Sequence, residues 1–196
     1  MAFDRGRLKK ELTELTRDTK SGVTVEVKSS DMMELEGVIT GPEGTPYEGG
    51  TYQIGITIPS GYPFEPPKMK FLTKIWHPNI SSQTGAICLD ILKDQWSPAL
   101  TIKTALLSLQ ALLCSPEPDD PQDAQVAQMY LNEPDTFKQT AKFWTETYAR
   151  PKEAGAEDAA VARLVEMGFS REQVVKALAD AKGDENEAVT ALLSGA

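Results

Sequence analysis

Cysteine and histidine are scarce in this chain of 196 residues, which contains two cysteines, Cys88 and Cys114, and one histidine, His77. Two cysteines cannot build the disulfide framework of a small secreted protein, and one histidine leaves no spacing typical of a zinc site. The composition therefore argues against metal catalysis. We expect no metal, no cofactor, and a reducing location in the cytoplasm or the nucleus.

Long apolar runs and an excess of positive charge are missing too. The longest apolar stretch, from Thr104 to Cys114, is too short and too amphipathic to span a membrane. The start of the chain carries four basic residues with no apolar segment behind them, unlike a signal peptide. The formal charge of −9, from 20 basic and 29 acidic residues, argues against nucleic acid as a partner. We expect neither a membrane nor a nucleic acid among the partners.

The apolar periodicity predicts an α+β domain over residues 1–150. Leucines at spacings of four and three predict an N-terminal helix, and alternating apolar residues then predict four strands. The turns between the strands are too short for crossover helices, so the expected sheet is an antiparallel meander. The strands are predicted near 23–27, 34–40, 52–58 and 69–71. Helices near 102–113, 123–132 and 134–149 follow, the first of them capped by Thr101.

The last part of the chain has a different character. Small and polar residues over 151–156 predict a linker, and residues 157–196 predict a bundle of three short helices. Ser170 and Gln173 have the spacing of a capping box at the start of the second helix. The expected miniature core consists of Leu164, Val165, Phe169, Val174, Val175, Leu178, Val189, Leu192 and Leu193.

The most informative segment lies between Thr73 and Leu100, where no periodicity is visible. It contains His77-Pro78-Asn79-Ile80 and, shortly after it, Gly85-Ala86-Ile87-Cys88-Leu89-Asp90. A lone cysteine is more often a small buried apolar residue than a nucleophile. Here Asn79 can donate a hydrogen bond to a developing oxyanion, and Gly85 is expected to let another molecule approach the backbone. We therefore predict that Cys88 is a nucleophile.

Residues 1–150 resemble the catalytic domain of the ubiquitin-conjugating enzymes over its full length. Besides the segment around Cys88, the matching stretches are Gly41-Pro42, Thr45 to Gly50, Tyr62 to Pro67, Trp96 to Pro98 and Pro118 to Pro121. The tail, with Met167-Gly168-Phe169 and Leu192-Leu193, resembles a ubiquitin-associated domain. Together the two resemblances imply the subtype of about 25 kilodaltons, whose family builds polyubiquitin chains of the proteasome-directed linkage.

The resemblance implies that Cys88 accepts ubiquitin as a thioester from the activating enzyme and passes it to a lysine amine. A thiol is a far better leaving group than an alcohol, which suits an acyl carrier. Asn79 would either donate to the oxyanion or brace the loop that carries Cys88. Asp120 would orient the amine and take up its proton. Because a nearby carboxylate raises a lysine pKa, desolvation at the thioester must supply the neutral amine.

Other roles follow from the same resemblance. His77 is tempting as a general base, but the resemblance implies a structural role, with the ring bonded to backbone. Asp90 is a candidate for shaping the acceptor site, and Cys114 is expected on the buried side of its helix. A cis peptide bond is implied between Tyr62 and Pro63.

The resemblance also assigns partner surfaces. Ligases are expected to contact two exposed loops, through Phe64, Ser97, Pro98 and Ala99. The activating enzyme would meet a basic helix face formed by Arg5, Arg7, Lys9 and Lys10, although a solvated face would explain these residues equally well. Non-covalent ubiquitin binding is implied for Met167, Gly168, Phe169, Leu192 and Leu193.

Two alternatives stay open at this point. A cysteine hydrolase would need a histidine base beside Cys88, and His77 is the only candidate in the chain. A catalytically silent relative that binds ubiquitin as a scaffold would be expected to lack the cysteine, yet Cys88 is present together with Asn79 and Asp120.

Overall fold

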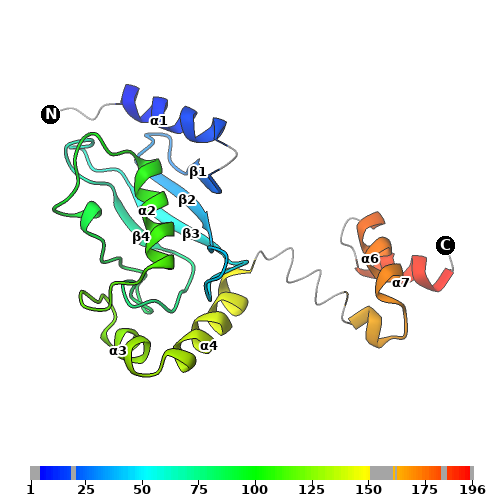
Figure 1. Cartoon of the computed structure of the whole chain (residues 1–196). Helices are drawn as coiled ribbons and strands as arrows, with labels where there is room; N and C mark the ends of the chain where they lie inside the picture. The colour runs from blue at the N-terminus through cyan, green and yellow to red at the C-terminus, as the bar shows by residue number, and fades with distance from the viewer. Residues whose placement is uncertain (1–4, 19–20, 151–160, 162, 182–184, 195–196) are drawn as a thin grey trace. The chain divides into compact units, whose positions relative to one another are not determined.

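The computed structural model describes residues 5–18, 21–150, 161, 163–181 and 185–194 (Figure 1). The chain divides into two compact units, Met1–Ala149 and Arg150–Ala196. The linker predicted over 151–156 lies outside the described residues.

The first unit is built on a sheet of four antiparallel strands in the order β1-β2-β3-β4, as the sequence predicts. The strands are β1 (Val23–Val27), β2 (Glu34–Thr40), β3 (Thr51–Thr57) and β4 (Lys68–Phe71). Alternating residues of β2 and β3 are buried, because side chains along a strand point to opposite faces. Gly37 of β2 leaves room for α2, since an added Cβ would lie 3.0 Å from the Leu106 side chain.

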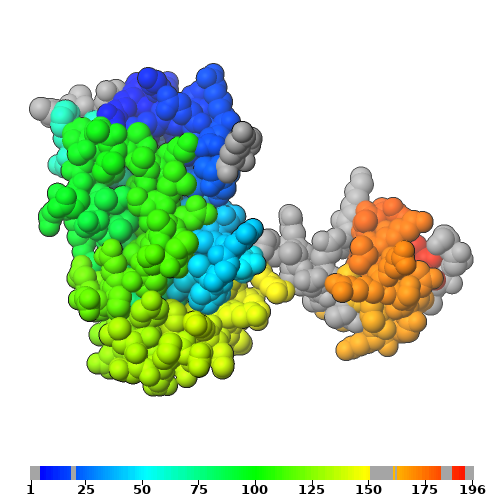
Figure 2. Space-filling view, in the orientation of Figure 1, coloured from blue at the N-terminus to red at the C-terminus, as the bar shows by residue number. Residues whose placement is uncertain are grey.

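Four helices accompany the sheet: α1 (Arg5–Arg17), α2 (Ile102–Cys114), α3 (Ala124–Asn132) and α4 (Pro134–Trp144), the last continued by a π-helical turn, η2 (Thr145–Ala149). α2 crosses one face of the sheet, while α1 lies at one end of this unit and α3 and α4 at the other (Figures 1 and 2). The predicted helices are confirmed. Thr101 caps α2 by accepting from the Thr104 amide, and Asp123 caps α3 by accepting from the Val126 amide.

The segment from Thr73 to Leu100 is irregular, apart from a short 3-10 turn, η1 (Asp90–Leu92). Buried polar contacts fix it, such as the one from the Tyr47 hydroxyl to the Trp76 carbonyl at 2.8 Å. The predicted cis peptide bond joins Tyr62 and Pro63. The expectation for Cys114 is wrong: its side chain is exposed at the end of α2, since the buried face of this helix passes through Leu112 and Leu113.

The second unit contains a helical turn around 163–166, α6 (Arg171–Asp180) and α7 (Glu185–Ser194). Its buried core consists of Leu164, Val174, Leu178 and Ala188. The capping box of Ser170 and Gln173 is confirmed. Val165 and Val175 were expected in the core, but they are 39% and 50% exposed, because each follows a fully buried residue and points to the other side of its helix.

Candidate active site

Three segments that are distant in the sequence converge around Cys88. The Cys88 amide donates to the Asn79 carbonyl at 2.9 Å. The Pro78 carbonyl accepts from the amides of Gln122 and Asp123, both at 2.9 Å. Bridges between Ile80 and Ile87 and between Lys70 and Ala86 join the same loops to the edge of β4. Backbone hydrogen bonds therefore hold the loop of Cys88 between the sheet and the segment that leads into α3.

Gly85 is required by the packing of this loop against β4, a reason that the sequence-based expectation did not include. Its φ is +73°, and an added Cβ would lie 2.0 Å from the Phe71 carbonyl oxygen. The Phe71 amide also donates to the Gly85 carbonyl at 2.9 Å. The glycine thus lets the loop of Cys88 approach the backbone of β4.

His77 is fully buried and both of its ring nitrogens are bound to backbone. Nδ1 accepts from the Asn79 amide at 3.0 Å, so the proton is on Nε2, which donates to the Leu112 carbonyl at 3.0 Å. Burial lowers the pKa of His77 to about 4, so the ring is neutral at physiological pH. No nitrogen is left to take a proton from a thiol, and the cysteine hydrolase alternative loses its base.

Asn79 is buried, and its side-chain amide is saturated by the segment that precedes α3. Nδ2 donates to the carbonyls of Glu117 at 2.8 Å and Asp120 at 2.9 Å, while Oδ1 accepts from the Glu117 amide at 2.8 Å. Since an amide group has two hydrogens, neither is free for an oxyanion in this arrangement. Of the two roles left open by the sequence, the geometry favours the brace.

The Cys88 thiol lies between two charged side chains. Sγ donates to Oδ2 of Asp120 at 3.2 Å and accepts from Nζ of Lys93 at 3.3 Å. Burial raises the pKa of the thiol and so does the Asp120 carboxylate, whereas the Lys93 ammonium lowers it; the net pKa lies above the usual value. Sequence reasoning missed Lys93, because a lysine five residues after a cysteine on an irregular loop belongs to no pattern.

The two other acidic predictions differ in what they contact. Asp120 is exposed, with its carboxylate on the thiol and its backbone carbonyl held by Asn79. Asp90 is exposed at the start of η1, and its Oδ1 accepts from the Ile91 amide at 2.7 Å. Asp90 therefore shapes the turn after Cys88, whereas the thiol forms its hydrogen bonds with Asp120 and Lys93.

The loops predicted to meet ligases lie against each other. Phe64 is 63% exposed, and Ser97, Pro98 and Ala99 are exposed on the second loop. The Trp96 indole donates to the Pro63 carbonyl at 2.8 Å and so ties one loop to the other. An exposed aromatic side chain beside a second exposed loop is compatible with a recognition anchor.

Buried Glu11 of α1 accepts hydrogen bonds from residues next to both loops. Its carboxylate accepts from the Tyr62 hydroxyl at 2.7 Å and from the Ile102 amide at 3.0 Å. Arg7, expected on the basic face, belongs to this network: Nε contacts Glu11 at 2.9 Å and Nη2 donates to the Leu100 carbonyl at 2.8 Å. The exposed cations of the predicted face are Arg5, Lys9 and Lys10.

In the second unit, Met167, Gly168 and Phe169 follow the helical turn around 163–166, and Leu192 belongs to α7. Met167 is 60% exposed, and Gly168 has a φ of +100°. Phe169 and Leu192 are partly buried against the small core. The side chain of Leu193 lies outside the described residues.

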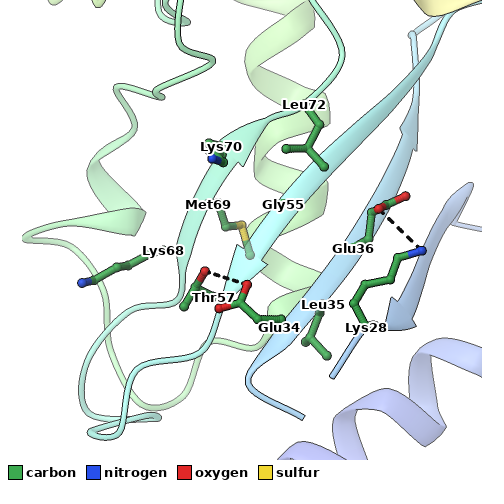
Figure 3. A pocket seen from close by; sticks show the side chains of 10 residues that line it. All are labelled: Lys28, Glu34, Leu35, Glu36, Gly55, Thr57, Lys68, Met69, Lys70 and Leu72. Atoms are coloured by element: carbon green, nitrogen blue, oxygen red, sulfur yellow. Dashed lines mark hydrogen bonds and ion pairs between the residues drawn. The ribbon is translucent and has the colours of Figure 1, made fainter. Parts of the chain in front are cut away.

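The first unit has a hollow of about 410 Å³ on the outer face of the sheet, where Lys28 contacts Glu36 at 3.6 Å and Thr57 donates to Glu34 at 3.0 Å (Figure 3). A further hollow, of about 430 Å³, is lined by Pro59, Glu65, Pro66, Pro67, Lys68, Met69, Ile87, Leu92 and Lys93. Within the described part of the chain, no cluster of His, Cys, Asp or Glu suits a metal ion. None of the helices described there has the length and apolar content needed to cross a bilayer.

Comparison with known proteins gives matches over both units. The profile of the ubiquitin-conjugating enzymes matches residues 7–145, and that of the UBA/TS-N domain matches residues 157–192. The chain is 59% identical to ubiquitin-conjugating enzyme E2 27 of Arabidopsis thaliana over 98% of this chain and 99% of the relative. It is 51% identical to ubiquitin-conjugating enzyme E2 K of Homo sapiens over 96% of both chains.

The chain belongs to the ubiquitin-conjugating enzyme family. The solved E2 domain of a Toxoplasma gondii ubiquitin-conjugating enzyme agrees, with a TM-score of 0.72 and 58% identity over 75% of this chain and 99% of that one. The predicted fold and the predicted enzyme class are confirmed. The enzyme is a transferase of ubiquitin with an appended ubiquitin-associated domain, and its family works with an activating enzyme and with ligases.

Proposed function

We propose that Cys88 is the residue on which this enzyme carries ubiquitin as a thioester. The contacts of its sulfur with Asp120 and Lys93 support this assignment, because they make it the thiol in contact with two charged groups. Cys114 supports it by contrast, since its Sγ faces a carbonyl of its own helix, that of Gln110, at 3.8 Å. A lysine amine then attacks the thioester carbon, and the Cys88 sulfur leaves with the electron pair.

Asp120 faces the incoming lysine in this proposal. Its exposed carboxylate lies at the sulfur, where it can orient an ammonium and receive the proton that the amine loses on attack. Asn79 and His77 act indirectly, by holding the segment that carries Asp120 and the loop that carries Cys88. Pre-set geometry of this kind saves the cost of ordering these groups during the reaction.

The proposed partner surfaces are the two exposed loops and the basic face of α1. Ligases bind at Phe64 with Ser97, Pro98 and Ala99, a surface kept in shape by Trp96 and Glu11. The activating enzyme meets the exposed cations Arg5, Lys9 and Lys10, while Arg7 holds the Leu100 loop. The scarcity of cysteine supports a cytoplasmic or nuclear location.

The tail domain binds ubiquitin without a covalent bond, through Met167, Gly168, Phe169, Leu192 and Leu193. A tethered second site of this kind raises the local concentration of a bound chain to about the millimolar range. We propose that it favours extension of polyubiquitin with the proteasome-directed linkage.

The central test is loading with ubiquitin, activating enzyme and ATP, followed by treatment with reductant. Wild type and Cys114→Ala should form the same reductant-sensitive adduct, and Cys88→Ser should form a resistant ester, because an oxygen ester is not cleaved by thiols. Equal thioester loading on Cys88→Ala would refute the assignment. Mass spectrometry of chains made without ligase reads the linkage.

A further inference from the structure

The Cys88 sulfur is held by two groups that act on it in opposite directions. A carboxylate near a thiol favours the neutral form, and an ammonium favours the thiolate. Asp120 and burial both oppose ionisation, while Lys93 donates to Sγ at 3.3 Å. Among the hydrogen bonds to this sulfur from described residues, the one from Lys93 alone favours the thiolate. Thioester exchange requires the thiolate as nucleophile.

The backbone after Cys88 places Lys93 next to the Cys88 sulfur. The Leu92 amide donates to the Leu89 carbonyl at 3.1 Å, and the amides of Lys93 and Gln95 donate to the Asp90 carbonyl at 2.9 and 3.1 Å. These bonds close η1 and turn the chain back toward the sulfur. Lys93 is exposed and also lines the hollow of about 430 Å³, together with Ile87 and Leu92.

We propose that Lys93 is a catalytic residue of the loading step, in which its ammonium stabilises the thiolate of Cys88. The proposal rests on the proposed function of Cys88 as the acyl carrier. Lys93 contacts the reacting sulfur itself, so its role differs from that of Asn79 and His77, which hold the backbone.

In this step the Cys88 thiol gives its proton to water. The thiolate attacks the carbonyl carbon of the thioester on the activating enzyme, and a carbon–sulfur bond to Cys88 forms. The carbon–sulfur bond to the activating enzyme's cysteine breaks, and that sulfur leaves with the electron pair and takes up a proton from water. Negative charge thus moves from one sulfur to the other, and Lys93 stabilises it at the start.

The proposal divides the two half-reactions between two residues. Once Cys88 is acylated, its sulfur carries no negative charge, and the attraction to Lys93 is lost. Asp120 then orients the attacking amine and receives its proton. Removal of the Lys93 charge should therefore slow loading more than it slows discharge of the preformed thioester to free lysine.

The first experiment measures alkylation of Cys88 by iodoacetamide from about pH 6 to about pH 10, with Cys114→Ala as the background because Cys114 is exposed. Lys93→Gln should react about three to ten times more slowly near neutral pH, a shift of about half to one unit in the profile. Lys93→Arg should restore the rate. Lys68→Gln is the matched control, since it removes the same charge from the same hollow and Lys68 makes no hydrogen bond to Sγ.

The charged groups around Lys93 determine whether each variant should alkylate faster or more slowly. Asp120 and Asp94 act on it in addition to the Cys88 thiol. Asp120→Asn should speed alkylation near neutral pH, the opposite of Lys93→Gln, because it removes the carboxylate that opposes the thiolate. Equal profiles for Lys93→Gln and the background, or no rescue by arginine, would overturn the proposal.

Loading kinetics complete the test. Lys93→Gln should lower the maximal rate of thioester formation by the same three- to tenfold, with a smaller effect on discharge. A slowed discharge with normal loading would also overturn the proposal. Because alkylation needs no ubiquitin, it separates the two ideas: Cys88→Ala that still loads refutes the carrier, whereas a normal Lys93→Gln profile refutes only this role of Lys93.

Discussion

In the first unit His77 and Asn79, next to the loop of Cys88, are buried and fixed by hydrogen bonds, whereas in the second unit the described candidate ubiquitin contacts are exposed or partly buried on a small core. His77 and Asn79 are almost inaccessible and use every side-chain donor on backbone. Met167 is 60% exposed, and the buried residues described in this unit are Leu164, Val174, Leu178 and Ala188. The first arrangement suits chemistry, which needs fixed distances, and the second suits weak binding.

The difference also predicts how each unit fails. A buried polar group that loses its partner costs about 1 to 3 kcal/mol, so substitutions in the first unit should disturb both stability and geometry. A bundle with so few buried residues is close to the limit of stability, so one core truncation should unfold it. The predictions below test this contrast, from the largest expected effect to the smallest.

Asn79→Ala should show the largest effect, because it frees two carbonyls and one amide of the segment before α3. We expect discharge to lysine to fall by about two to three decades and the free energy of unfolding by about 2 to 4 kcal/mol. Single-turnover discharge and urea unfolding measure the two. Gln83→Ala, an exposed amide of the same loop, is the control. Lost discharge with full stability would point to the oxyanion role.

Glu11→Ala should lower the free energy of unfolding of the first unit by about 3 kcal/mol, since it leaves Tyr62 and the Ile102 amide without their acceptor. It should also weaken ligase binding, because both ligase loops rest on this carboxylate. Denaturant unfolding and titration with a ligase domain are the measurements. Glu14→Ala, exposed on the same helix, should change neither. Normal ligase affinity in the destabilised variant would contradict the link.

Leu164→Ala should destabilise the tail by about 2 to 3 kcal/mol, enough to unfold a bundle of this size. Loading of Cys88 should stay intact and affinity for polyubiquitin should fall. NMR of the full chain reports the fold of each unit, and titration reports binding. Val175→Ala, at an exposed position, should leave the fold unchanged. A loading defect in Leu164→Ala would contradict the separation of the units.

Acid should weaken the first unit through His77, the only histidine of the chain. Its pKa is about 4 when folded and 6.5 in the unfolded reference, so the unfolded state binds the proton first as pH falls. The stability is complete above about pH 6.5 and decreases by about 2 kcal/mol by about pH 5. The loss should be missing in His77→Gln, and the imidazole proton shift should not titrate until near pH 4. A midpoint near 6.5 in the folded enzyme would refute the burial argument.

Regular elements were predictable because their signals are local. The period of two in β2 and β3, and the caps Thr101 and Ser170, depend on a few neighbouring residues. Side-chain exposure at helix edges was less predictable. Val165, Val175 and Cys114 lie next to buried positions, and only the packing partner decides which of two adjacent residues is covered.

The residues of the site also divide into those that the sequence predicted and those whose contacts only the structure showed. Cys88 and Asn79 were proposed from residues and spacing, and Asp120 was proposed from the resemblance to the family. The contacts of Arg7 and the reason for Gly85 were not predicted, because each depends on a segment that is distant in the sequence. The contact of Lys93 was not predicted either, because the irregular loop after Cys88 shows no pattern that places this side chain.

By itself, the sequence determined the elements, the likeness to a family and the residue types that can carry out acyl transfer, since these follow from composition, periodicity and spacing within short windows. Only the tertiary structure decided that His77 has no free nitrogen, that Asn79 braces the Asp120 segment and that the thiol lies between a carboxylate and an ammonium. The physical reason is that ionisation and hydrogen bonding depend on distances of about 3 Å between groups that can be far apart along the chain.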